Sequence, residues 1–253
     1  NRIPFDRADS VNSGLVNERD LGVFFYWAPS EIRERFKYLV ESGLKGSGDY
    51  GVVGFGAYNG QTANRSELND DLHIVGRLSY PFQFANCQIF EPGISGYMGD
   101  YNVATSGAIA GNGVDYSDQR AAVSFVLYPQ PLGLQGEYTW GEGPELNAAQ
   151  NAVINGKIEG GYFQVFYKID EIGNGGKGTL IPYARIQRYD GGRKHEVNAP
   201  NYRIREAETG VEYQFSKALE LTLAYTWAER TFPALPYQQE KGGLVRMQLQ
   251  WNY

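Results

Sequence analysis

The last twelve residues of the chain alternate between apolar and polar side chains. One set of alternate positions is large and apolar: Val245, Met247, Leu249, Trp251 and Tyr253. The positions between them are polar: Arg246, Gln248, Gln250 and Asn252. Successive side chains of a β-strand point to opposite faces, so this pattern predicts a strand with one apolar face and one polar face.

Two segments immediately upstream repeat this alternation. Residues 203–215 and 219–230 are both predicted strands, and a three-residue turn at 216–218 connects them. Their opposite ends lead into longer polar segments, such as 231–241. Short turns at one end of the strands and long loops at the other are the layout of outer-membrane β-barrels.

The same pattern extends backwards and predicts eleven strands in all. Each is about as long as the ~9–11 residues that a tilted strand needs to cross a bilayer. The predicted strands are 20–28, 49–59, 72–82, 94–104, 118–128, 132–141, 158–169, 178–189, 203–215, 219–230 and 242–253. With a stub at Ile3 to Phe5, about 11–12 strands are present. The prediction is therefore an all-β chain, in which 1–253 form a single antiparallel transmembrane β-barrel domain.

Loop lengths give this barrel a direction. If the C-terminus is periplasmic, the outside carries the long loops 59–71, 105–117, 142–157, 190–202 and 231–241. The periplasm then receives the turns 129–131, 170–177 and 216–218.

Aromatic residues support this direction by forming two belts at headgroup depth. Trp140 and Trp227 end strands on the outer side. Strand ends on the periplasmic side carry Trp27, Tyr213, Phe215, Trp251 and Tyr253. The alternative is that these rings fill the core of a soluble β-sandwich. Polar residues along the whole of each opposite face favour the barrel.

One segment, 30–46, breaks the two-residue period. Its apolar residues recur with helical spacing: Ile32, Phe36, Leu39 and Val40. Ser30 is a suitable N-cap, and Gly43 or Gly46 can end a helix. We expect one short amphipathic helix near 30–44 in the periplasmic connection between the first two strands. A continued strand is the alternative.

Composition and motifs argue against several classes of function. The chain has one cysteine, Cys87, and two histidines, which excludes an internal disulfide and argues against a Cys/His zinc site. A net charge of −6 argues against nucleic acid as a partner. Walker, HExxH, GxSxG and CxxC motifs are absent from the sequence, so we expect no enzyme, catalytic residue, metal or cofactor. His73 is expected to be a hydrogen-bonded wall residue, and His195 to be solvated in a charged loop.

Charged side chains predicted to point inward form the candidate functional surface. Parity places ten of them there: Arg77, Arg120, Lys168, Arg185, Arg246, Glu137, Glu206, Glu208, Glu212 and Glu220. Such charges are inexpensive in a water-filled lumen and costly toward lipid. They either line a permeation path whose arginines attract anions, or form cross-strand salt bridges that only hold the wall. Arg77 and Arg185 fall near the middle of their predicted strands, which predicts weak anion preference.

Several short motifs, taken in order, resemble the porins of the phosphate-selective O/P type. They are Arg-Ile-Pro-Phe at 2–5, Asn-Glu-Arg-Asp-Leu-Gly-Val at 17–23, and the segments 48–51, 58–61, 77–82, 134–138, 181–185 and 191–194. The resemblance covers nearly the whole chain. It implies a sixteen-stranded, homotrimeric porin of the bacterial outer membrane with an anion-preferring, constricted lumen. Its partners would be outer-membrane lipid and small hydrophilic or anionic solutes.

The chain departs from that family pattern in two ways. It begins at the end of a strand, so N-terminal strands and an early constriction loop are expected to be missing from this segment. Its inward glutamates also dilute the arginine-rich path of the phosphate-selective members.

Three functions follow from these observations. The first is a passive diffusion channel for small hydrophilic solutes. The second is a structural barrel that scaffolds partner proteins in the outer membrane, and the third is a soluble β-sandwich binding protein. Dependence on detergent separates the third from the others, and conductance separates the first from the second.

Overall fold

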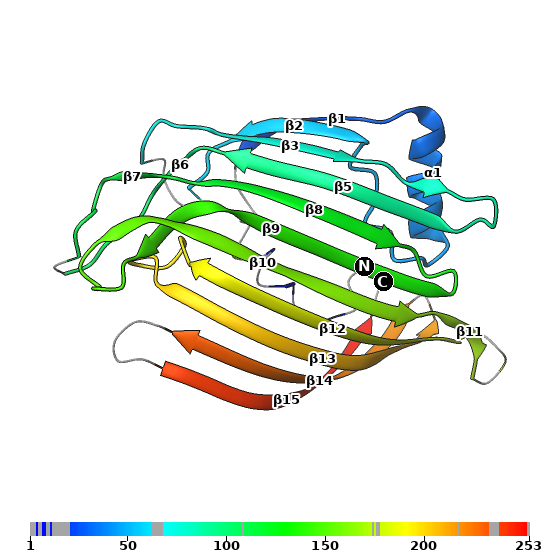
Figure 1. Cartoon of the computed structure of the whole chain (residues 1–253). Coiled ribbons are helices and arrows are strands. Elements are labelled where there is room, and N and C mark those ends of the chain that lie inside the picture. Colours follow the sequence, from blue (N-terminus) through cyan, green and yellow to red (C-terminus); the bar gives the residue numbers. More distant parts are fainter. Residues whose placement is uncertain are drawn as a thin grey trace.

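A single curved antiparallel sheet makes up most of the structure, a computed structural model (Figure 1). It describes residues 4, 7, 8, 11, 21–61, 68–107, 109–173, 175, 178–216, 218–232 and 238–251. Ile3 and Phe5 of the predicted stub and the motif residues 17–20 lie outside this described part.

Eleven strands follow one another across the sheet in chain order, and all neighbours are antiparallel. They are β1 (Gly22–Trp27), β2 (Val53–Tyr58), β3 (His73–Ser79), β5 (Ile89–Met98), β8 (Gln119–Leu127), β9 (Leu132–Leu146), β10 (Val153–Tyr167), β12 (Gly178–Gly192), β13 (Asn201–Ser216), β14 (Leu219–Phe232) and β15 (Gln238–Trp251). Two short strands pair beside this path: β4 (Phe82–Gln83) with β5, and β11 (Ile169–Ile172) with β12. A separate two-stranded sheet joins β6 (Asp100–Asn102) and β7 (Asp115–Ser117).

These eleven strands correspond one to one with those predicted, but the fourth was misplaced. It was expected at 94–104, whereas β5 begins at Ile89 and ends at Met98. The reason is a tight hairpin, in which Phe82 of β4 pairs with Phe90 of β5 across a turn that contains Cys87. Proline is unusual inside a strand because it has no N–H to donate, so Pro92 concealed the start of β5.

The predicted loops 142–157 and 190–202 are also too long. β9 continues to Leu146, which pairs with Val153 of β10, and the ladder between β12 and β13 persists to Gly192 and Asn201. Beyond a membrane both faces of a strand can be polar, so the ladder continues after the alternation ends. Trp140 and Trp227 therefore do not end their strands. Each lies eight residues after the first residue of its strand, and the strands continue to Leu146 and Phe232.

The convex face of the sheet carries an exposed apolar band, which is bordered by charged residues toward the loop end of the strands. Along β12 the outward side chains run from Leu180 to Ile186, which is 60% exposed, and then change to Arg188. On β14 the change falls between Trp227 and Glu229. Trp140 and Trp227 are both exposed, and Trp227 lies at this edge of the band on β14, as expected for an aromatic residue at a membrane interface.

The sheet is open between its first and last strands. Within the described residues, β1 pairs with β2 alone and β15 with β14 alone. The predicted strands 20–28 and 242–253 therefore do not pair with each other. The expectation that strands are missing requires this open edge.

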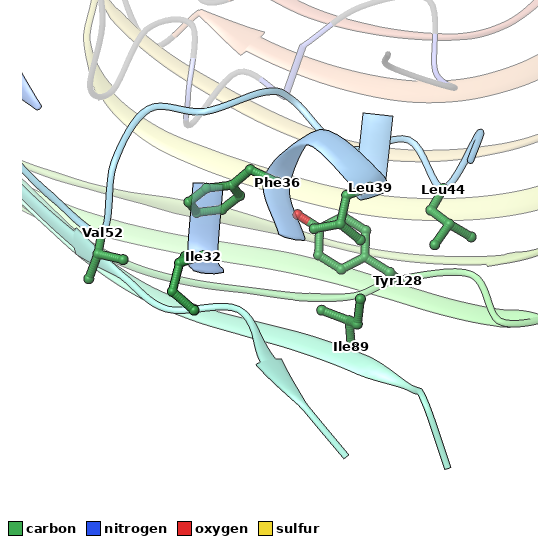
Figure 2. Packing of buried hydrophobic residues seen from close by; sticks show 7 residues of the cluster. All are labelled: Ile32, Phe36, Leu39, Leu44, Val52, Ile89 and Tyr128. Atoms are coloured by element: carbon green, nitrogen blue, oxygen red, sulfur yellow. The ribbon is translucent and has the colours of Figure 1, made fainter. Parts of the chain in front are cut away.

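The predicted helix is present as α1 (Ser30–Glu41), beside the turn end of the sheet (Figure 1). Its buried residues Ile32, Phe36 and Leu39 pack against a cluster that also contains Leu44, Val52, Ile89 and Tyr128 (Figure 2). Hydrophobic burial therefore holds the helix against the turn ends of β5 and β8.

The ends of α1 differ in part from the prediction. Ser30 is the first helical residue and not the N-cap, because Pro29 occupies that position without a capping side chain. Glu41 is the last helical residue, and Gly43 follows in a left-handed conformation with φ 69°, which glycine adopts without strain. Val40, predicted to share the apolar face, is exposed.

Candidate functional site

The concave face of the sheet gathers buried charged and polar side chains, the reverse of a soluble core. Deeply buried examples include Arg120, Arg185, Glu208 and Glu212. Apolar clusters flank this polar belt between β10 and β14. Phe166, Ile181, Tyr183 and Ala224 lie on its turn side, and Ile158, Tyr189, Tyr202 and Ile204 on its loop side. The predicted inward parity of the charged residues agrees with this arrangement.

Arg185, Glu206, Glu208 and Arg246 form one network at the centre of this belt. Arg185 lies 3.3 Å from Glu206 and 3.8 Å from Glu208, and Arg246 lies 3.0 Å from Glu208. Hydrogen bonds from Tyr183 and Thr226 reach the same Glu208 carboxylate at 3.0 and 2.8 Å. Two arginines and two glutamates thus neutralise one another, which satisfies charges that burial would otherwise penalise.

Arg77 lies toward the turn end of the wall and not at its middle as predicted. It is the fifth residue of the seven-residue β3, and it donates to the carbonyls of Tyr50 and Gly51 in the connection after α1. Its guanidinium also lies 3.3 Å from Glu91. Glu91 in turn accepts hydrogen bonds from Ser79 and Tyr128, at 2.8 and 2.6 Å.

Arg120 belongs to a fully buried cluster around Asp118 at the loop end. Asp118 contacts Arg120 at 2.9 Å and His73 at 3.2 Å, and it also pairs with Lys194 from the loop between β12 and β13. Burial opposes the charge of Asp118, but Arg120 and Lys194, with hydrogen bonds from His73 and Lys194, hold the pKa of this carboxyl below its usual value. His73 is hydrogen-bonded within the wall, as predicted.

Sequence reasoning missed Asp118 and Lys194 as partners. Lys194 stood in the charged segment 191–194, but nothing local indicated that its side chain reaches inward. Its neighbour His195 was expected to be solvated. It is instead half-buried, with its ring 6.2 Å from that of Tyr101 between centroids.

Three loops at this end are joined into a cap, comprising residues 103–107 with 109–114, 147–152 and 193–200. The Asn198 N–H donates to the Ala104 carbonyl at 2.8 Å, and the Ala110 N–H donates to Asn151 at 2.8 Å. Tyr101, Val103, Tyr116, Val153 and Ala199 form an apolar cluster that joins the same segments. The Asp118–Lys194 contact attaches this cap to the wall.

The connection between α1 and β2 extends across the concave side at the turn end. Lys45 in this connection forms a 2.5 Å ion pair with Glu212 on β13, and the two side chains are 11% and 2% exposed. Gly46 allows the turn, because a Cβ there would lie 2.7 Å from Leu39 Cβ. Lys168, predicted to line the path, pairs with Asp170 on β11 at the same end.

A cavity of about 270 Å³ lies on the concave face, bounded by the wall, by this connection and by the described N-terminal residues 4, 7, 8 and 11. Its lining includes Lys45, Glu137, Tyr162 and Arg185. Glu137 and Glu220, both predicted to point inward, are half-buried.

A protein-family comparison decides the class of this molecule. The model of the family described as phosphate-selective porin O and P matches residues 99–253, more than half of the chain. The chain belongs to this family. The match takes in the elements from β6 to β15, while the motifs noted before residue 99 lie outside it. No curated protein matches the chain.

Family membership identifies this chain as an outer-membrane porin of the phosphate-selective type, and a porin family indicates the channel class. The all-β antiparallel architecture agrees with that class. No helix in the described part of the chain is long and apolar enough to cross a membrane.

Proposed function

We propose that this porin is a passive diffusion channel for small hydrophilic solutes, with the concave polar belt as the lining of their path. One observation carries this proposal: buried charges occupy the concave face, while large apolar side chains are exposed on the convex face. A lipid-embedded wall around a wet lumen requires this distribution, whereas a soluble sandwich requires the opposite.

We also propose that further strands outside this segment complete the wall to sixteen, and that three such barrels associate. The open edges of β1 and β15 support completion, because unpaired N–H and C=O groups are costly in lipid. Both the strand number and the trimer follow the family resemblance.

The proposed channel has a weak preference for anions, to which Arg77 and Arg185 contribute. A fixed charge acts over a longer effective range in a narrow pore with low-dielectric walls than at an open mouth. Arginine removal would leave its carboxylate partners uncompensated, Glu91 in one case and Glu206 with Glu208 in the other.

Single-channel recording of the complete protein in planar bilayers tests the channel and its preference for anions. We expect stable conductance steps, and a reversal potential under a salt gradient that moves toward cation preference in Arg77→Ala and Arg185→Ala. Unchanged potentials would make these arginines purely structural. Absence of conductance from correctly inserted protein would reject the channel and favour the scaffold role.

A further inference from the structure

We infer that Glu137, in the cavity between the wall and the α1–β2 connection, is a binding point for small organic ammonium compounds. The inference deepens the proposed channel function and rests on it for the route by which the solute arrives. It concerns a carboxylate whose surroundings differ from those of the other acidic residues on the concave face.

The other buried carboxylates of this face have basic partners. Glu91 faces Arg77, Glu206 faces Arg185, and Glu208 faces both Arg185 and Arg246. Glu212 is paired with Lys45. For Glu137 Oε1, which is buried, the described part of the chain supplies no hydrogen-bond donor.

Basic residues of the same cavity do not compensate Glu137. Lys45 and Arg185 line the cavity, yet both already contact other carboxylates. Arg7 also lines it, but this residue is exposed, and solvent and salt screen its charge. Among the described lining residues Glu137 is the one acid, so a cation arriving from the lumen meets a carboxylate whose Oε1 has no hydrogen-bond donor in the described part of the chain.

The remaining walls indicate which cation fits. Leu44, Val126 and Phe166 supply apolar surface for an alkyl chain. Tyr162 adds an aromatic ring, and aromatic faces attract ammonium groups. Gln135 donates to the Tyr162 hydroxyl at 2.9 Å and so holds this tyrosine in place. A cavity of about 270 Å³ with one carboxylate and mixed apolar and aromatic walls suits a short primary alkylammonium ion.

Isothermal titration calorimetry on the complete protein in detergent micelles tests the inference without requiring conduction. Butylammonium chloride is the probe, with butanol and sodium butyrate as probes of matched size that lack the positive charge. We expect the wild type to bind butylammonium in preference to both. Glu137→Gln keeps the side-chain shape but removes the charge, and should weaken binding roughly tenfold.

Two further variants control for folding and for net charge. Glu137→Asp retains the carboxylate one methylene further back and should recover part of the affinity. Glu159→Gln removes a carboxylate from the convex face of β10, where it pairs with Arg188, and should leave the affinity unchanged. Equal affinity in wild type and Glu137→Gln, or equal binding of butanol, would overturn the inference.

Conductance separates this inference from the proposed function. If the wild type conducts but butylammonium binding does not depend on Glu137, the inference fails and the channel stands. If Glu137-dependent binding is measured in a protein that does not conduct, the channel proposal fails while the binding site remains.

Discussion

The first and last strands of the sheet are built on different scales. β1, β2 and β3 have 6 or 7 residues, whereas the six strands β9, β10 and β12 to β15 have 14 to 16. At ~3.3 Å per residue the short strands extend about 20–23 Å, and the long ones about 46–53 Å. A tilted short strand therefore falls short of an apolar band of about 25 Å, while a long one extends beyond it.

Each part is supported in a way that matches its strand length. The short strands lean on α1, whose buried cluster lies at their turn end, and on the Arg77–Glu91 contact. The long strands carry an ion-pair network at their centre and an interlocked cap at their outer end. The short strands are thus stabilised by the segment that contains α1. The long strands are stabilised by ion pairs between neighbouring strands and by contacts between their loops.

The largest effect is expected from Glu208→Ala in the long-strand part. This change leaves Arg185 and Arg246 without a central carboxylate, and breaking a buried ion pair costs about 3–5 kcal/mol. Urea unfolding in lipid vesicles measures the loss. A loss under about 1 kcal/mol would show that water, not Glu208, solvates these arginines.

Leu39→Ala should come next and act mainly on the short-strand part. Truncating a fully buried leucine costs about 2–5 kcal/mol, here at the contact between α1 and the wall. Hydrogen exchange should accelerate in β1 to β3 and remain slow in β12 to β14. Uniform acceleration across the sheet would mean that the two parts do not differ in their support.

A third change addresses the lipid-facing side of the long strands. Leu223 lies midway between Leu219 and Trp227 on the outward face of β14, so Leu223→Arg should cost about 2–4 kcal/mol. Gln248→Arg, on the concave face of β15, should be tolerated. Leu249→Arg should cost less than Leu223→Arg, because Leu249 lies only two residues from the end of β15. Equal folding yields in vesicles for Leu223→Arg and Gln248→Arg would refute the assignment of faces.

The smallest effect is expected from Arg188→Ala on the convex face. Arg188 and Glu159 are 62% and 54% exposed, and ion pairs of this kind contribute about 0–1 kcal/mol. The same vesicle unfolding assay should show little difference from wild type. A loss as large as that of Glu208→Ala would remove the contrast between exposed and buried charge pairs.

Local sequence patterns predicted the elements in which apolar side chains face one side and polar side chains face the other. Alternation located the eleven strands and the inward parity of Arg185 and Glu208, and helical spacing located α1. The start of β5 was misplaced because Pro92 and the β4 hairpin hide it. Strand ends beyond the membrane were missed because the contrast between faces, and therefore the alternation, disappears there.

The candidate site was predicted less completely, because its contacts join distant parts of the chain. Parity placed Glu137 among the inward residues, but could not show that the described part of the chain offers no hydrogen-bond donor to its Oε1. Asp118 and Lys194 are 76 positions apart in sequence and meet only in the folded sheet, so no short stretch of sequence could reveal their contact.

The ion pair between Lys45 and Glu212 has a consequence for the order of folding. Its two residues are 167 positions apart in sequence, with the strands from β2 to β12 between them. Contacts of such long range carry a high loop-closure entropy until the intervening chain is ordered. We therefore expect this pair to form late, after the intervening wall has assembled. A bond absent from the folding transition state slows unfolding without accelerating folding, so Lys45 should prolong the lifetime of the inserted barrel more than it hastens insertion.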